Sequence, residues 1–262
     1  MTAHSLDNLW SLPEEILARF ELGARLDAKP FALIDEAIAL RRCALYRKAF
    51  KGIAISYPAT LLEFDALAAW IRREQVTVDV TNAAELNRAI AARIDPMYIV
   101  MHPQGRAVAP IRGAVNTGAA RFVVSSSRQV AILGDRADRI QRVVVVVATH
   151  HAGGALASDV LTHPELELIG LHCNLDDPDD AIGTVKLRQM VAEMVRIRRA
   201  HNVLLTRVSL AGLDVGEHWL EPRILRRVAE AMGEVIGAAC TQHRYPRPAL
   251  TVSPSRAALL PA

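Results

Sequence analysis

Hydrophobic residues occur along this chain in short runs that alternate with longer amphipathic segments. The short runs are rich in β-branched residues, as in RVVVVVA at residues 142–148, and are typical of parallel strands buried on both faces. The pattern predicts eight such strands, at residues 52–57, 76–80, 97–101, 121–124, 142–148, 166–172, 202–210 and 248–252.

Apolar residues at three- and four-residue spacing predict helices between these strands. The helices are expected at residues 62–73, 83–92, 129–134, 186–200 and 221–240, with a short one before Gly118. Two more, at 13–26 and 33–50, precede the first strand, and we expect them to cap one end of the domain.

Strands connected in this way are compatible with a doubly wound sheet or a barrel, because parallel strands need right-handed helical crossovers. Eight strands favour the barrel. We therefore predict a single α/β fold, a (β/α)8 TIM-like barrel over residues 52–262, with N-terminal helices in residues 1–51 packed on it.

Charge and composition narrow the function classes. The 31 basic residues are dispersed among 28 acidic ones, for a net charge of +3, so we expect no nucleic-acid binding. No apolar run is long enough to cross a membrane, and the start lacks a secretion signal, which together predict a cytoplasmic protein. The three cysteines, Cys43, Cys173 and Cys240, are too widely spaced to predict a disulfide framework or a zinc site.

Functional groups of a (β/α)8 barrel lie at the C-terminal ends of its strands, and four segments there carry a family resemblance. VDVTNAAELNRAI (78–90), LIGLHCNLDD (168–177), VSLAGLDVG (208–216) and LTVSPSRA (250–257) are similar, in order, to LDVCTGGELAVAL, GLHSHIGS, VDLGGGLG and LVVEPGRA. Those are motifs of the diaminopimelate/ornithine/arginine decarboxylases, which depend on pyridoxal phosphate (PLP).

The resemblance runs from about residue 53 to the end and implies the family's N-terminal PLP-binding barrel, an alanine-racemase-like domain of fold type III. The chain stops six residues after Arg256, so we expect the family's second domain, a C-terminal β-barrel, to be absent.

The family's chemistry requires a Schiff-base lysine, an acid against the pyridine nitrogen, an imidazole over the ring and glycine amides around the phosphate. By the resemblance, Pro58 or Thr60 stands at the lysine position, Ser253 at the acid and Asn174 at the imidazole. Three of the phosphate-site glycines are replaced, by Ala211, Leu213 and Ser255.

Some remnants of the family's site are still expected. Lys48, in a Lys-Ala-Phe run that closes a helix, is a Schiff-base candidate among only four lysines. The resemblance implies a degenerate phosphate site at Gly212, Gly216 and Arg256. It also implies a pocket lined by Tyr57, Asp79, Glu85, His172, Asn174 and Ser253.

Several polar segments allow a functional and a plain structural interpretation. His172, Asn174, Asp176, Asp177 and Asp179 have oxygen and nitrogen ligands for a cation, but we favour a solvated loop and expect no metal site. The residues 150–154, HHAGG, favour a flexible loop over a catalytic one.

Other features of the strand ends are open to the same choice. Residues 125–127, all serine, favour a helix N-cap over an anion site. Asp79 and Glu85 could serve only loop hydrogen bonds and a helix start. Large side chains at the strand ends suggest that the pocket is filled, namely Leu61, Leu175 and Leu213.

The first functional hypothesis is a non-catalytic homologue, a pseudoenzyme without cofactor, that acts through protein binding or regulation. Its partner would be a second copy, forming a homo-oligomer, or a full-length decarboxylase; the family offers a parallel in antizyme inhibitors. One alternative is a divergent PLP-dependent decarboxylase-like enzyme that uses Lys48 or Lys51. Another is a small-molecule or anion-binding barrel that uses Arg256.

Overall fold

Eight parallel strands close into a barrel, as predicted. The computed structural model describes residues 30–105, 107–147, 152–175, 183–213 and 221–260. Each strand pairs with the next in sequence, and the last pairs with the first through Ala54↔Thr251 and Ile55↔Val252. The strands are β1 (Ala54–Pro58), β2 (Thr77–Val80), β3 (Ile99–Met101), β4 (Arg121–Val124), β5 (Gln141–Val146), β6 (Leu166–Asn174), β7 (Arg207–Leu213) and β8 (Ala249–Pro254).

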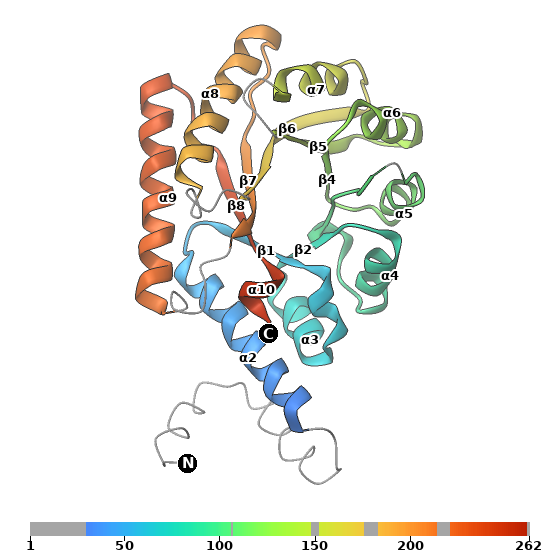
Figure 1. Cartoon of the computed structure of the whole chain (residues 1–262). Coiled ribbons are helices and arrows are strands. Elements are labelled where there is room, and N and C mark those ends of the chain that lie inside the picture. Colours follow the sequence, from blue (N-terminus) through green and yellow to red (C-terminus); the bar gives the residue numbers. More distant parts are fainter. Residues whose placement is uncertain (1–29, 106, 148–151, 176–182, 214–220, 261–262) are drawn as a thin grey trace.

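Helices surround the barrel on the outside (Figure 1). Those that connect successive strands are α3 (Asp65–Glu74), α4 (Ala83–Ala91), α5 (Ala109–Thr117), α6 (Ser127–Arg136), α7 (Ala152–Leu161), α8 (Thr184–His201) and α9 (Pro222–His243). Short elements complete the described fold, namely η3 (Ala59–Glu63), η4 (Pro96–Tyr98) and α10 (Arg256–Leu259). None of the described helices is long and apolar enough to span a membrane.

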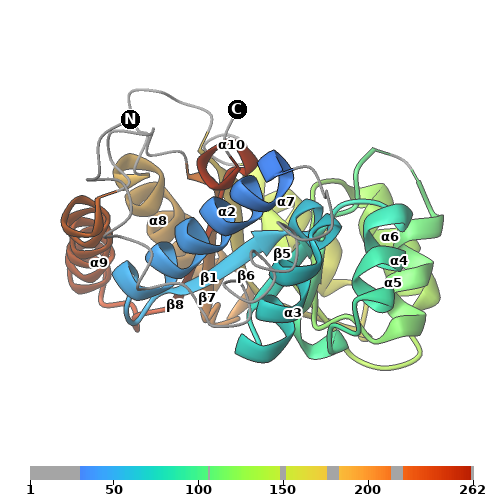
Figure 2. The ribbon, with the colours of Figure 1, turned by 90° about the horizontal axis from the view of Figure 1, so that it is seen from below.

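The N-terminal helix α2 (Pro30–Ala49) packs on the barrel and contacts β1, α3 and α9 (Figures 1 and 2). It thereby occupies the eighth position of the outer helical ring, between the helices next to β8 and β1. The other N-terminal helix expected, at residues 13–26, lies outside the described residues.

Two apolar clusters follow from the period-two alternation of the strands. The larger one lies between the outer faces of the strands and the helices, and includes Val78, Val80 and residues of α2 such as Cys43. The smaller one fills part of the barrel interior and consists of Val100, Val123, Val144 and Ile169, with Val146 packed against it. The remaining interior positions are therefore the ones available for polar groups.

The prediction of a flexible loop at residues 150–154 is wrong for Gly153 and Gly154, which lie in the first turn of α7. Small residues are needed there because the helix packs closely on its neighbours. A Cβ on Gly153 would lie 3.1 Å from Val147 Cγ2 and 3.2 Å from Glu193 Oε1. The glycines therefore indicate close packing of a helix, although in a sequence they suggest a loop.

The seventh strand begins and ends later than predicted, at Arg207 and Leu213. Asn202 ends α8 in a left-handed conformation with φ of 54°, so the chain first has to turn. The backbone that follows is held by a side chain: the Leu205 N–H donates to Tyr245 Oη over 2.8 Å, and that hydroxyl donates to the Leu205 carbonyl over 2.9 Å. Leu205 is therefore buried without belonging to the sheet.

Replacing Tyr245 with Phe is expected to lower the free energy of unfolding by about 1–3 kcal/mol, because both polar groups of the buried Leu205 backbone lose their partner. Urea denaturation followed by circular dichroism measures this loss. Tyr98→Phe is the matched control, since that hydroxyl forms no hydrogen bond with any described residue. Equal losses in the two variants would contradict a bridging role for Tyr245.

Candidate functional site

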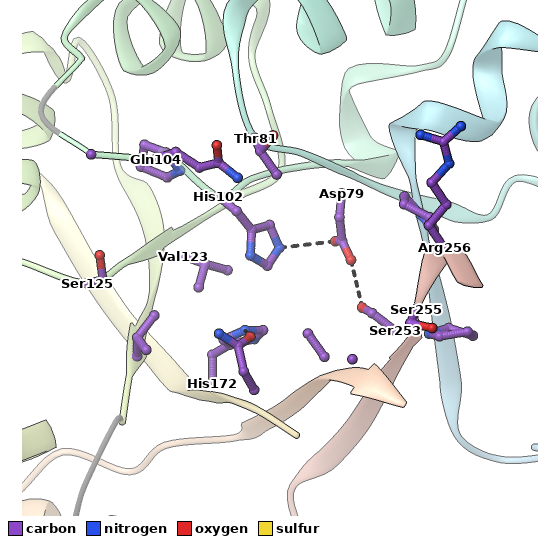
Figure 3. A pocket seen from close by; sticks show the side chains of 18 residues that line it. Asp79, Thr81, His102, Gln104, Val123, Ser125, His172, Ser253, Ser255 and Arg256 are labelled. Atoms are coloured by element: carbon purple, nitrogen blue, oxygen red, sulfur yellow. Dashed lines mark hydrogen bonds and ion pairs between the residues drawn. The ribbon is translucent and has the colours of Figure 1, made fainter. Parts of the chain in front are cut away.

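An open pocket of about 470 Å³ lies at the carboxyl ends of the strands, where barrel sites are expected (Figure 3). Polar side chains from five segments line it, namely Asp79, Thr81, His102, Gln104, Ser125, His172, Asn174, Ser253, Ser255 and Arg256. The expectation that leucines fill this space is wrong. Leu61 and Leu213 are fully buried in the outer apolar cluster, and Leu175 packs against the same cluster.

The Asp79 carboxylate is the centre of the polar network in this pocket. Asp79 alternates with the buried Val78 and Val80 of β2, which places its side chain inside the barrel. Its Oδ1 accepts hydrogen bonds from Ser56 Oγ over 2.6 Å and from His102 Nε2 over 3.1 Å, and its Oδ2 accepts from Ser253 Oγ over 2.6 Å (Figure 3). One side chain thus connects β1, β2, the end of β3 and β8.

These contacts fix the charge of Asp79. Burial alone would raise the pKa of its carboxyl group, but the charge of His102 and the hydrogen bonds from His102, Ser253 and Ser56 outweigh burial and lower the pKa to about 2. The side chain is 14% exposed and is therefore a largely enclosed anion. It is ionised throughout the neutral and mildly acidic range.

His172 lies beside His102, with the two rings edge to face and 5.1 Å between their centroids. Burial, and then the nearby His102 charge, lower the pKa of His172 to about 4, so its imidazole is neutral at pH 7. Its Nε2 lies 3.2 Å from Asn174 Oδ1, an acceptor, which assigns the single ring proton to Nε2. Its Nδ1 then accepts from Ser209 Oγ over 3.1 Å.

Six of the residues that the resemblance placed in the pocket or the phosphate site line this pocket: Asp79, His172, Asn174, Gly212, Ser253 and Arg256. Gly216 lies outside the described residues, as do His150, His151 and the carboxylates Asp176, Asp177 and Asp179. Within the described part of the chain, no group of three or more His, Cys, Asp or Glu side chains is placed to hold a metal ion.

Sequence reasoning missed His102, which directly follows β3 and provides the imidazole on Asp79. The signal that was available is its position, since the first residue after a barrel strand is a usual place for a functional side chain. Ser125 also lines the pocket. Its neighbour Ser126 is the N-cap of α6 and accepts from the Gln129 N–H, in line with the N-cap interpretation of this serine run.

Tyr57 and Glu85 were expected in the pocket, and both lie outside its lining. The Tyr57 hydroxyl donates to the Cys43 carbonyl of α2 over 2.6 Å, and its ring packs edge-on against Trp70, so it belongs to the outer core. Glu85 Oε2 accepts from the Thr81 N–H and hydroxyl over 2.7 and 2.9 Å. This carboxylate therefore holds the start of α4, where Asn82 is the N-cap.

Lys48 is also remote from the pocket. It is exposed in the last turn of α2, a few residues before the amino end of β1, and so lies toward the opposite end of the barrel. Of the two residues aligned with the family's lysine, Pro58 lines the pocket and Thr60 does not. Among the described residues that line the pocket there is no lysine.

The two described remnants of the phosphate site differ in their geometry. Gly212 has a φ of +82° at a bulge between β7 and β8, and a Cβ there would lie 3.3 Å from the Leu175 carbonyl oxygen, so this position favours glycine. Arg256 is the first residue of α10, whose N-cap is Ser255. Its guanidinium extends away from Asp79 and His102 (Figure 3).

Comparisons with known proteins agree with this fold. A family profile described as "Pyridoxal-dependent decarboxylase, pyridoxal binding domain" matches residues 37–161. A diaminopimelate decarboxylase of Actinosynnema pretiosum is 25% identical over 90% of this chain and 60% of its own length. One of Mycobacterium tuberculosis is 27% identical over 87% of this chain and 59% of its own length. The chain thus spans about 60% of these relatives.

Solved structures give the same picture for the fold alone. Diaminopimelate decarboxylase from M. jannaschii superposes with a TM-score of 0.72 at 16% identity, over 86% of this chain and 60% of that one. Lysine/ornithine decarboxylase from Vibrio vulnificus superposes with a TM-score of 0.70 at 13% identity, over 86% of this chain and 62% of that one.

The low pKa of His172 predicts a pH-dependent stability. Between about pH 6.5 and pH 4 the unfolded chain binds a proton at this imidazole that the folded chain does not, so stability falls as the pH is lowered through this window. The free energy of unfolding is expected to decrease by roughly 2 kcal/mol from this residue between pH 7 and pH 5.

Urea denaturation of the wild type, His172→Gln and His243→Gln at both pH values measures the effect. The His172 variant should lose most of the decrease. The variant at His243, a partly exposed residue at the end of α9, should retain it. A wild-type decrease that persists in full in His172→Gln would contradict the neutral, buried state of that imidazole.

Proposed function

We infer that this chain, whose sequence and fold resemble the pyridoxal-binding barrel of the PLP-dependent diaminopimelate and ornithine decarboxylases, is a non-catalytic homologue that acts by binding. The similarity supports the relation to these enzymes. The observation that carries the proposed loss of chemistry is the lining of the pocket, in which Pro58 faces the cavity at the position aligned with the Schiff-base lysine.

No other described lysine substitutes for the missing amine. Lys48 and Lys51 are exposed before the amino end of β1, and Lys186, in the first turn of α8, is not part of the lining. A Schiff base requires an amine that reaches the cofactor carbonyl, and a proline ring provides none. The remaining lysine of the sequence, Lys29, lies outside the described residues.

The group that would tune the cofactor is also altered. Ser253 stands where the resemblance implies an acid, and its hydroxyl donates to Asp79 over 2.6 Å. A neutral hydroxyl cannot stabilise a protonated pyridine nitrogen as an anion does. Asn174, at the position implied for the stacking imidazole, accepts from His172. The described residues therefore do not fit PLP held as a catalytic Schiff base.

A second candidate function, the binding of a small molecule or anion, is favoured by the pocket itself. Its volume of about 470 Å³ is within the range of ligand sites, and its wall combines apolar residues with a few polar groups. Without the lysine side chain this cavity stays open. Changes in the loops of a barrel readily convert a catalytic site into a binding site.

The partner we propose is a second copy of the chain or a full-length decarboxylase of the same family. This part of the proposal rests on the resemblance. Large exposed apolar side chains among the described residues are spread over separate elements and do not mark a single interface; examples are Ile90, Met97, Ile140 and Leu204.

Adding PLP to the purified protein is expected to give no Schiff-base absorption band, and borohydride reduction no mass adduct at a single lysine. The reason is that no lysine occurs among the described residues that line the pocket. Intact-mass analysis with peptide mapping is the measurement. A stoichiometric adduct on one residue of the wild type would overturn the non-catalytic function.

A variant with a lysine in the pocket lining adds a positive control to this test. Pro58→Lys places an amine in the lining and should yield an adduct at residue 58 if the cavity still admits the cofactor. Ala257→Lys is the matched control, since this residue is exposed on α10 and lies outside the lining. Equal labelling of both variants would indicate surface reaction and not a pocket.

The binding role predicts a complex. Sedimentation velocity of the protein alone, and mixed with a full-length diaminopimelate decarboxylase, should show a species heavier than the monomer in at least one of the two samples. A monomer in the first and two independent boundaries in the second would contradict this partner proposal.

A further inference from the structure

Two arginines lie inside the barrel at the end opposite the pocket. Arg121 begins β4 and shares its face of the strand with Val123, a member of the interior apolar cluster. Arg207 begins β7 and shares its face with Ser209, whose hydroxyl meets His172 in the interior. Both side chains therefore start from the amino ends of strands and face the barrel axis.

The strands between them add one more cation and one anion. Arg142 of β5 and Glu167 of β6 are register partners and share the interior faces of Val144 and Ile169. Arg142 Nε lies 3.7 Å from Glu167 Oε2, and both side chains are more than half exposed. On this stretch of the rim, from β4 to β7, three guanidinium groups thus face a single carboxylate, which Arg142 already engages.

Arg121 and Arg207 lack such compensation. Neither forms a hydrogen bond or an ion pair with any residue in the described part of the chain, although both are partly buried. Burial, and then the charges of Arg207 and Arg142, lower the pKa of Arg121, and the charge of Asp79 offsets this only in part. An arginine stays protonated under these conditions, so the rim holds positive charge without a matching anion.

We propose that the amino-terminal mouth of the barrel binds a small oxyanion, namely a phosphate group, between Arg121 and Arg207. Both guanidinium groups start from interior-facing positions at the same end of the barrel, and each supplies planar pairs of N–H donors that match the oxygens of phosphate. Arg142 is near enough in register to add a third charge. This site lies at the opposite end of the barrel from the pocket, and it is independent of the function proposed for that pocket.

Calorimetric titration with inorganic phosphate, at constant ionic strength maintained with sodium chloride, tests the site. Arg121→Gln and Arg207→Gln should each weaken binding by about tenfold or more, as expected for losing one charge-assisted contact. Glu167→Gln should strengthen binding several-fold, because it removes the competing carboxylate. Arg226→Gln, an exposed arginine of α9, should leave the affinity unchanged.

Arg256→Gln separates this site from the pocket, where an arginine also lies. Loss of binding in Arg256→Gln, with unchanged binding in Arg121→Gln, would place the anion in the pocket and overturn the proposal, as would no binding of phosphate by the wild type at millimolar concentration. If Arg121→Gln does not fold, Arg121→Lys tests the same site with the positive charge kept. Glu167→Gln then tests it with the net positive charge of the rim increased. Glycerol phosphate in place of phosphate distinguishes a free ion from a phosphate monoester.

Discussion

Three hydrogen bonds converge on one carboxylate inside the barrel, from Ser56 of β1, His102 after β3 and Ser253 of β8, and the pocket is built around them. Asp79 joins the first strand of the barrel to the last across the seam where the barrel closes. Removal of this buried acceptor would leave three hydrogen-bond donors unsatisfied, which costs free energy. The three donor side chains around Asp79 are therefore held in place. The carboxylate also binds one neighbouring imidazole, His102, while burial and the nearby His102 charge hold the second imidazole, His172, neutral.

The interior of the barrel divides around this carboxylate. Its β3 to β6 side is closed by Val100, Val123, Val144 and Ile169, whereas its other side carries small hydroxyl groups that serve Asp79 and His172. Ser253 illustrates the consequence. At the position where the related enzymes are expected to hold an acid, this chain has a donor that completes the Asp79 network. Asp79, His172, Ser56, Ser253 and Ser209 all have hydrogen-bond partners within the network, which contains no lysine among the described residues.

The strands and most helices could be predicted because burial on both faces leaves a clear pattern of β-branched runs. The side-chain directions at strand ends could not. Neighbouring strand residues face opposite sides, so a shift of one position separates Pro58, which lines the pocket, from Tyr57, which packs on α2. The resemblance aligned the correct segments and included Asp79, His172 and Ser253. It could not indicate His102, since no motif marked this residue and its importance depends on contacts across strands.

Charge is distributed unevenly along the barrel axis, and this asymmetry follows from the same strands. At the carboxyl end, Asp79 is an anion that accepts three hydrogen bonds, whereas at the amino end Arg121 and Arg207 have no described partner. Between the two ends lies the smaller apolar cluster of Val100, Val123, Val144 and Ile169. The charge of Asp79 raises the pKa of Arg121, but burial and the charge of Arg207 outweigh it. The same barrel strands thus give its two ends opposite electrostatic character, with an anion at the carboxyl end and cations at the amino end.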